Sequence, residues 1–292
     1  MNFAGEQGMN QIGLVLAGGG GKGAYQIGVW RYLKEKGLDQ YVGGVSGTSV
    51  GALNAVLFAA GDIFAAEKIW KNITQNQILS NRSPVNLETA LMEWKRVDEI
   101  DFCSRSSVER EINRLRNQAV FSREGLLKIM HRYVDMRKVQ NAGIPCYATC
   151  LEMSGIPKVR RFDLRHYAKK SIETILLASS AIPAIFDPVL FDGKNYYDGG
   201  ITMLGGDNIP IKPLYDVGIR FFIVVHLDRD AKIDRKEFPG SCILEIIPQK
   251  DLGNLLTGTL DFSPGGAAWR IEQGYRDTKK VFDGYFRSGT VR

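Results

Sequence analysis

A serine flanked by glycines is the first feature of this sequence that could do chemistry. Ser49 lies in the segment Gly47-Thr48-Ser49-Val50-Gly51, between an apolar run and an alanine-rich stretch. A GxSxG segment at a strand-to-helix turn is typical of a nucleophile elbow, which lifts the serine hydroxyl clear of a sheet. Glycines two residues to either side relieve the crowding in such a turn. A glycine-rich helix cap would show the same pattern, so Ser49 is a candidate nucleophile that needs a base and an anion site nearby.

A second glycine-rich segment lies earlier in the chain. It comprises Gly18, Gly19, Gly20, Gly21, Lys22 and Gly23. Backbone N–H groups in such a loop, at the start of a helix, form an anion site, and three kinds of site compete. A P-loop requires Ser or Thr after the lysine, where Gly23 stands. A dinucleotide site fits the GxGxxG spacing but lacks the acidic residue expected about 20 positions later, since Asp39 precedes the second strand. The third kind is an oxyanion hole, whose donors must lie beside a nucleophile.

Two residues are candidates for the base that would activate Ser49. Asp198 follows two tyrosines and precedes two glycines, which places a carboxylate on an open turn. An ordinary Asp-Gly hairpin has the same sequence. His226 ends an apolar run, and a late histidine is the base that an α/β-hydrolase would use. The remaining histidines, in a helical stripe and a basic run, are His131 and His166.

Two strand–turn–helix units position these residues. The apolar run 12–16 leads into the glycine loop and a helix that Gly37 is placed to end. The run 42–46 leads into the serine turn and a helix that Gly61 would close. Repeated units of this kind indicate a parallel α/β sheet, in which ligands bind beyond the carboxyl ends of the strands. Further strands are expected at 144–151, 158–162, 219–227 and 242–247.

The segment 72–137 has a different character, because it is polar, basic and helical without a clear strand. Ser106 with Glu109 has the spacing of a capping box, and Ser122 is a second candidate cap. No linker rich in proline or glycine flanks the segment. We therefore interpret it as a helical insertion packed against the sheet of a single domain, 9–292, and expect residues 1–8 to be dispensable.

Two later helices are also expected. Ser171 is a candidate cap for the first of them. The second, at the C-terminus, carries one stripe that we expect to face the core. The stripe consists of Ile271, Tyr275, Thr278, Phe282 and Tyr285.

Composition excludes several classes of protein. Of the 292 residues, 44% are hydrophobic and 24% are charged, with a net charge of +6, so wholesale disorder and fibrous folds are excluded. No run approaches the ~20 apolar residues of a membrane span, and the N-terminus has no secretory signal. The cysteines lack the spacing of a metal site, so we expect free thiols, no metal and a cytoplasmic location. They are Cys103, Cys146, Cys150 and Cys242.

Four ordered blocks of the sequence resemble the patatin-like phospholipases. The blocks are the loop 18–23, the serine turn 47–51, Ala178-Ser179-Ser180-Ala181-Ile182-Pro183 and Asp198-Gly199-Gly200. The resemblance runs from about residue 12 to 202. It implies an α/β fold with a central, mostly parallel sheet between helices, in three α/β/α layers, and a hydrolase without a cofactor.

The same resemblance implies a Ser–Asp dyad. Ser49 would be the acyl nucleophile, and Asp198 would take its proton and later activate water. The N–H groups of Gly19, Gly20 and Gly21 would hold the oxyanion, with Lys22 adding positive charge. An aspartate is a poor base unless an apolar site raises its pKa. The neighbours expected to do so are Phe186, Phe191, Tyr196 and Tyr197.

The substrate that the resemblance implies is a phospholipid or lysophospholipid, cleaved at a fatty acyl ester. Such an enzyme must meet a membrane, and a basic segment could hold anionic head groups at its inner face or form a solvated connection. The segment contains Arg160, Arg161, Arg165, Lys169 and Lys170. Alternatives are an anion- or nucleotide-binding regulatory module that uses the Gly18 loop, a hydrolase that uses His226, and a latent effector that needs an activator.

Overall fold

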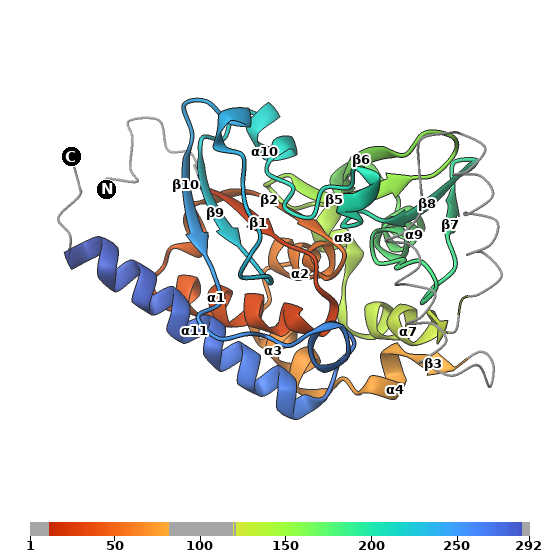
Figure 1. Ribbon diagram of the computed structural model, residues 1–292, viewed down its shortest axis with the longest axis horizontal. Coiled ribbons are helices and arrows are strands. Elements are labelled where there is room, and N and C mark those ends of the chain that lie inside the picture. The colour runs from red at the N-terminus through yellow and green to blue at the C-terminus, as the bar shows by residue number, and fades with distance from the viewer. Residues whose placement is uncertain (1–11, 82–118, 120, 288–292) are drawn as a thin grey trace.

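Eight strands form one sheet in the computed structural model, which describes residues 12–81, 119 and 121–287 (Figure 1). The spatial order is β10-β9-β1-β2-β5-β8-β7, and β6 pairs with β5. The strands are β1 (Ile12–Leu16), β2 (Val42–Thr48), β5 (Cys146–Glu152), β6 (Lys158–Asp163), β7 (Val189–Phe191), β8 (Lys194–Asp198), β9 (Phe221–Val225) and β10 (Cys242–Ile246). From β10 to β5 all neighbours are parallel, whereas β6, β8 and β7 pair antiparallel. The mostly parallel sheet is therefore confirmed.

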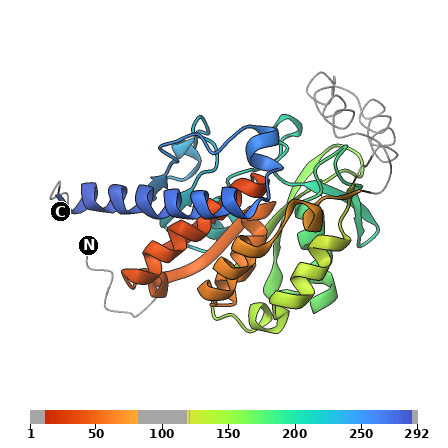
Figure 2. The same cartoon turned by 90° about the horizontal axis from the view of Figure 1, so that it is seen from below.

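Both faces of the sheet are covered. Alternate residues of β1 enter different cores: Leu14 and Leu16 join the main core, and Val15 joins a smaller core on the opposite face. Burial on both faces explains why β1 is apolar along its whole length. Figure 1 shows α1, α3 and α11 on one side of the strands and α10 on the other, and Figure 2 shows α1 and α11 running side by side. The helices flanking the sheet include α1 (Ala24–Glu35), α2 (Val50–Ala59), α3 (Ile63–Asn72), α9 (Lys169–Ser179), α10 (Lys212–Asp216) and α11 (Pro264–Arg287).

Strand β5 carries two strands end to end along one of its edges. Its other edge is occupied by β6, which pairs with every residue from Tyr147 to Glu152. On the edge that carries two strands, β2 pairs in parallel with β5 as far as Thr48, which lies opposite Thr149. The antiparallel β8 then takes over, with Asp198 opposite Cys150. The carboxyl ends of β2 and β8 therefore meet at adjacent positions of β5.

The segment 72–137 is partly helical, as predicted, but its described part also contains two strands. These are β3 (Ser80–Asn81) and β4 (Phe121–Ser122), which pair antiparallel, so the prediction of a strand-free segment was wrong. The described helices are α4 (Gln75–Ile78), α7 (Glu124–Tyr133) and the start of α8 (Met136–Gln140). Met130 and Met136 enter the main core. The capping pair Ser106 and Glu109 lies outside the described residues, as do residues 1–8, and the single-domain assignment stays a prediction.

Two predicted helix caps need correction. Helix α9 begins at Lys169, so Ser171 lies inside it rather than at its cap. Ser122 accepts a hydrogen bond from the N–H of Glu124 at 3.2 Å, but the residue at the N-cap of α7 is Arg123.

The C-terminal stripe faces inward as predicted where the structure describes it. In α11, Ile271, Thr278 and Phe282 are buried, and Tyr275 is half-buried. Cys146, Cys150 and Cys242 are free thiols, and Cys103 lies outside the described residues.

Candidate active site

Ser49 occupies a strained turn between β2 and α2. Its φ of 57° and ψ of −126° are rarely adopted by a residue with a side chain, and such a conformation costs about 1–3 kcal/mol. A Cβ on Gly47 would lie 2.2 Å from the carbonyl of Gly51, and a Cβ on Gly51 would lie 2.1 Å from the carbonyl oxygen of Leu16. Both positions therefore require glycine, as a nucleophile elbow demands.

Ser179 holds the backbone of this turn. Its hydroxyl accepts a hydrogen bond from the N–H of Ser49 at 2.9 Å and donates one to the carbonyl oxygen of Thr149 at 2.7 Å. Ser179 is fully buried. Ser179 belongs to the third family block, but its role is visible only in the fold, where α9 ends beside the elbow.

Asp198 lies beside Ser49 because β2 and β8 end at neighbouring positions of β5. Both residues line the same cleft, and the Ser49 hydroxyl lies close enough to the carboxylate to lower its pKa. The carboxylate accepts a hydrogen bond from the N–H of Gly200 at 2.8 Å. Both Ser49 and Asp198 are only 5% exposed. The two residues expected to form the dyad are thus brought together from positions far apart in the sequence.

Burial raises the pKa of Asp198 from 3.8 to about 6, although the hydrogen bonds from Ser49 and Gly200 oppose the rise. A carboxylate with this pKa is a stronger base than an exposed aspartate. Of the expected apolar neighbours, Tyr197 precedes Asp198 directly and is 1% exposed. Phe191 packs instead against the rings of Phe162 and Tyr196.

The glycine loop reaches the same place from β1. Residues Gly20–Gly23 form a 3₁₀ turn that continues into α1, and the first amides of such a run have no acceptor within the helix. Gly20 has a φ of +55°, and a Cβ there would lie 2.0 Å from the carbonyl oxygen of Thr259. Gly19 and Gly20 line a cleft together with Ser49 and Asp198. Gly21 is buried and lines neither of the cavities that open at Ser49.

Two further residues hold this loop, and the sequence analysis missed both. Asn208 accepts a hydrogen bond from the N–H of Gly18 at 3.1 Å through its side-chain oxygen. Arg270, which is 2% exposed, binds the segment 252–261 that packs against the loop. Its guanidinium donates to the carbonyl oxygens of Leu252, Thr257 and Asp261 and to the Asp261 carboxylate.

Lys22 extends along the cleft toward the segment 252–261. Burial lowers its pKa, and the charges of Asp228 and Asp251 oppose that effect. Lys22 therefore lines the cleft beside the glycine loop, which is the position expected of a residue that adds positive charge there.

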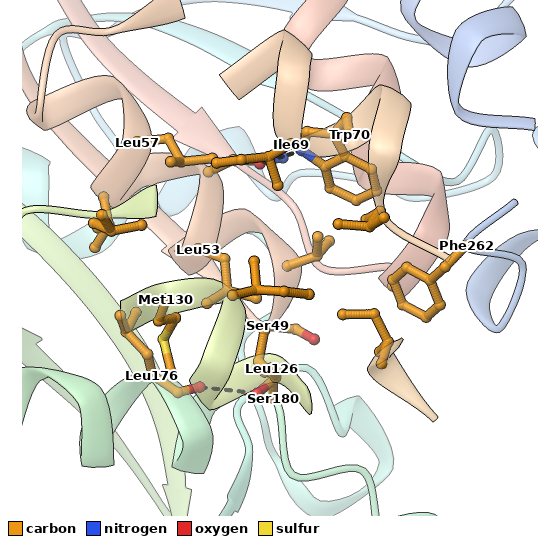
Figure 3. A pocket seen from close by; sticks show the side chains of 18 of the residues that line it. Ser49, Leu53, Leu57, Ile69, Trp70, Leu126, Met130, Leu176, Ser180 and Phe262 are labelled. Atoms are coloured by element: carbon orange, nitrogen blue, oxygen red, sulfur yellow. Dashed lines mark hydrogen bonds between the residues drawn. The ribbon is translucent and has the colours of Figure 1, made fainter. Parts of the chain in front are cut away.

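Two cavities of opposite character meet at Ser49. A narrow pocket of about 100 Å³ runs beside α2 and is lined almost entirely by apolar side chains (Figure 3). They include Leu53, Leu57, Ile69, Trp70, Met130 and Phe262. A wide cleft of about 920 Å³, lined by both polar and apolar side chains and called the polar cleft below, opens on the other side and contains Asp198, the glycine loop and charged residues such as Arg161, Asp228 and Lys232.

His226 does not reach this site. It is fully buried at the end of β9, where its Nε2 lies 2.9 Å from Glu245 Oε2. Strand β1 separates β9 from β2, which places His226 about 10 Å from the elbow at the usual spacing between strands. Burial lowers its pKa. Of the two candidate bases, only Asp198 therefore lies beside Ser49.

The basic segment is largely neutralised by carboxylates. The ion pairs are Arg160–Glu152 at 2.6 Å, Arg161–Asp207 at 2.6 Å, Arg165–Asp163 at 2.6 Å and Lys169–Glu173 at 3.9 Å. The net positive charge of this segment is therefore smaller than the sequence suggests.

Within residues 12–81 and 121–287, no cluster of His, Cys, Asp and Glu could hold a metal ion. No helix in those ranges has the length and apolarity needed to cross a membrane.

Comparison with known proteins places the chain in a family. The family model of the patatin-like phospholipases matches residues 14–215, so the chain belongs to this family, whose members are typically serine acyl hydrolases. An uncharacterised NTE family protein of Mycobacterium tuberculosis is 24% identical over 218 residues, which cover 75% of this chain and 49% of the relative. A patatin-like phospholipase domain-containing protein of Caenorhabditis elegans is 27% identical over 73% of this chain and 13% of its own length.

The chain thus spans about half the length of the mycobacterial relative that it matches. Among solved structures, VipD from Legionella pneumophila superposes with a TM-score of 0.55 at 16% identity, covering 94% of this chain and 67% of VipD. That likeness shows a shared patatin-like fold.

Proposed function

We propose that this protein is a lipid acyl hydrolase of the phospholipase A or lysophospholipase type. The observation that carries the proposal is the position of the Ser49–Asp198 pair at the junction of an apolar pocket and a polar cleft. An ester of a fatty acid has the same division, with a hydrocarbon chain on one side of the reacting carbonyl and a polar alcohol on the other. An apolar cavity of this order favours an apolar ligand over water.

The reaction would proceed in two steps. In the first, Asp198 accepts the proton of the Ser49 hydroxyl as the oxygen attacks the ester carbonyl. The N–H groups of Gly19 and Gly20 stabilise the oxyanion, and the proton passes from Asp198 to the leaving alcohol. In the second step, water enters from the polar cleft, gives a proton to Asp198 and attacks the acyl-enzyme carbonyl. The bond to the Ser49 oxygen then breaks, Asp198 returns its proton to that oxygen, and the fatty acid is released.

The proposal is tested by labelling Ser49 with a fluorophosphonate probe and by measuring hydrolysis of a panel of phospholipids and lysophospholipids by mass spectrometry. We expect the wild type to be labelled and to release fatty acid, and Ser49→Ala to do neither. Ser180→Ala is a suitable control, because this hydroxyl also lines the apolar pocket but donates to the carbonyl oxygen of Leu176. A folded wild type that shows neither labelling nor hydrolysis would instead favour an anion-binding module.

A further inference from the structure

Two buried amide side chains hold the two ends of the glycine loop. Gln26 in α1 donates from Nε2 to the carbonyl oxygen of Ala17 at 2.7 Å, directly before the loop. Asn54 in α2 donates from Nδ2 to the carbonyl oxygen of Gly23, the last residue of the loop, at 2.9 Å. Both side chains belong to residues that are 2% exposed. The loop that presents the oxyanion donors is therefore fixed at its entry and its exit.

Asn54 also connects the parts of this arrangement to one another. Its Nδ2 donates a second hydrogen bond to Gln26 Oε1 at 2.8 Å, and its Oδ1 accepts one from Trp70 Nε1 at 3.0 Å. Both amide hydrogens and the amide oxygen are thus engaged. Because Asn54 lies in the helix that begins after Ser49, the network ties the loop to the same helix that follows the nucleophile.

Trp70 brings the apolar pocket into the network. Its ring lines the pocket and stacks on Phe262, with centroids 6.4 Å apart and planes at 17° (Figure 3). A ligand in the pocket would contact the Trp70 side chain, whose N–H fixes Asn54. Asn54 itself is among the few polar residues in the lining.

We propose that Asn54, with Gln26, is a positioning residue for the glycine loop and that Trp70 links this positioning to the apolar pocket. The inference rests on the proposed acyl hydrolase function. An oxyanion donor displaced by about 1 Å can lower the rate by about 10²-fold, so a clamp on the loop should affect the rate more than the affinity.

The sharpest test compares two identical substitutions. Gln26→Met removes the clamp at Ala17, whereas Gln273→Met removes another buried amide, which donates to Asp277 Oδ1 at 2.7 Å within α11. We expect Gln26→Met to lower kcat and the rate constant of fluorophosphonate labelling about 10-fold to 100-fold, with KM changed little. Gln273→Met should lower only the melting temperature. Asn54→Leu should behave like Gln26→Met.

A second pair of variants changes fewer atoms. Trp70→Phe keeps a ring in the pocket but removes the hydrogen bond to Asn54, so labelling should slow about threefold to tenfold. Trp30→Phe is its control, because the indole N–H of Trp30 has no hydrogen-bond partner among the described residues. This pair decides the question even if Gln26→Met and Asn54→Leu do not fold.

The inference is overturned if Trp70→Phe is labelled as fast as the wild type, or if folded Gln26→Met differs from the wild type only in melting temperature. These outcomes differ from failure of the proposed function. In that case the wild type itself would be neither labelled nor active.

Discussion

The apolar pocket and the polar cleft open from the same residue, yet they differ in width, lining and charge. The pocket is about 100 Å³ and bounded by packed helices, whereas the cleft is about 920 Å³ and bounded by loops that carry both signs of charge. Asp198 lines the cleft and not the pocket. The difference separates two tasks: the pocket would hold the acyl chain away from water, and the cleft would admit the head group and the water that ends the cycle.

The largest expected effect comes from Asp198→Asn, which removes the base on the cleft side. We expect kcat to fall by about 10²–10⁴, the usual contribution of a general base. We also expect the variant to be more stable than the wild type at pH 8. The folded-state pKa of Asp198 is raised from 3.8 to about 6, so its charged form opposes folding.

The direction of the pKa shift of Asp198 sets the pH range over which folding stability changes. The stability contributed by a protonated Asp198 is present below about pH 4 and is lost as the pH rises through about 6, at a cost of up to about 3 kcal/mol. Denaturant melts at pH 8 and pH 4 should therefore show a gain for Asp198→Asn that shrinks at the lower pH. Asp216→Asn, an exposed carboxylate paired with Lys212, should show neither change. An unchanged kcat would remove Asp198 from the mechanism.

The pH dependence of the wild type gives the next prediction. Because the base must be ionised, kcat/KM should rise tenfold per pH unit below about pH 6 and level off above it. A buffer series from pH 4.5 to pH 8.5 (about four units) measures this profile. If the rising limb instead disappeared in His226→Ala, the base would be the histidine.

On the pocket side, Leu57→Phe tests the depth of the apolar cavity. Leu57 lies about 12 Å along α2 from Ser49, at 1.5 Å per residue, and Figure 3 shows it well separated from Ser49. The larger ring should weaken binding of long acyl chains about tenfold and leave short ones unaffected. Rates on esters of increasing chain length check this. An equal effect on all lengths would mean that the chain does not enter this pocket.

The smallest expected effect belongs to the exposed charges of the cleft. Lys232→Glu should change the rate on anionic relative to zwitterionic vesicles by about fivefold, because one basic residue near a lipid surface contributes about 1 kcal/mol. The change should diminish as salt is added. Lys68→Glu, an exposed lysine on α3 outside the cleft, is the matched control. If both variants behave alike, the cleft does not face the lipid.

The parts of this site that could be predicted from the sequence are those that local backbone geometry demands. Gly47 and Gly51 around Ser49, and Gly20 and Gly21 in the 18–23 loop, stand where a Cβ would collide with backbone, so they leave a readable pattern. Ser179 and Asn208 contact the site across 130 and 190 positions of sequence. The pattern of a single sequence carries no signal for contacts between residues so far apart in the chain.

Element boundaries were less predictable for a related reason. Helix α9 begins at Lys169 without a capping side chain, so Ser171 gave a misleading signal. The two-residue strands β3 and β4 are too short for periodicity to reveal. The two tyrosines before Asp198 do not reveal the direction of β8, and its antiparallel pairing with β5 is what brings Asp198 to Ser49.

The meeting of β2 and β8 along β5 makes the dyad depend on a single alignment. Sliding β8 by one position would move Asp198 by about 3.3 Å and turn its side chain to the opposite face of the sheet. A molecule with that slip would keep its helices and most of its sheet but would lose the proximity of Asp198 to Ser49. The N–H of Asp198 donates a hydrogen bond to the carbonyl oxygen of Ala181 at 3.0 Å, and this bond stabilises the observed register. The pairing of one short strand thus decides whether Ser49 and Asp198 meet at all.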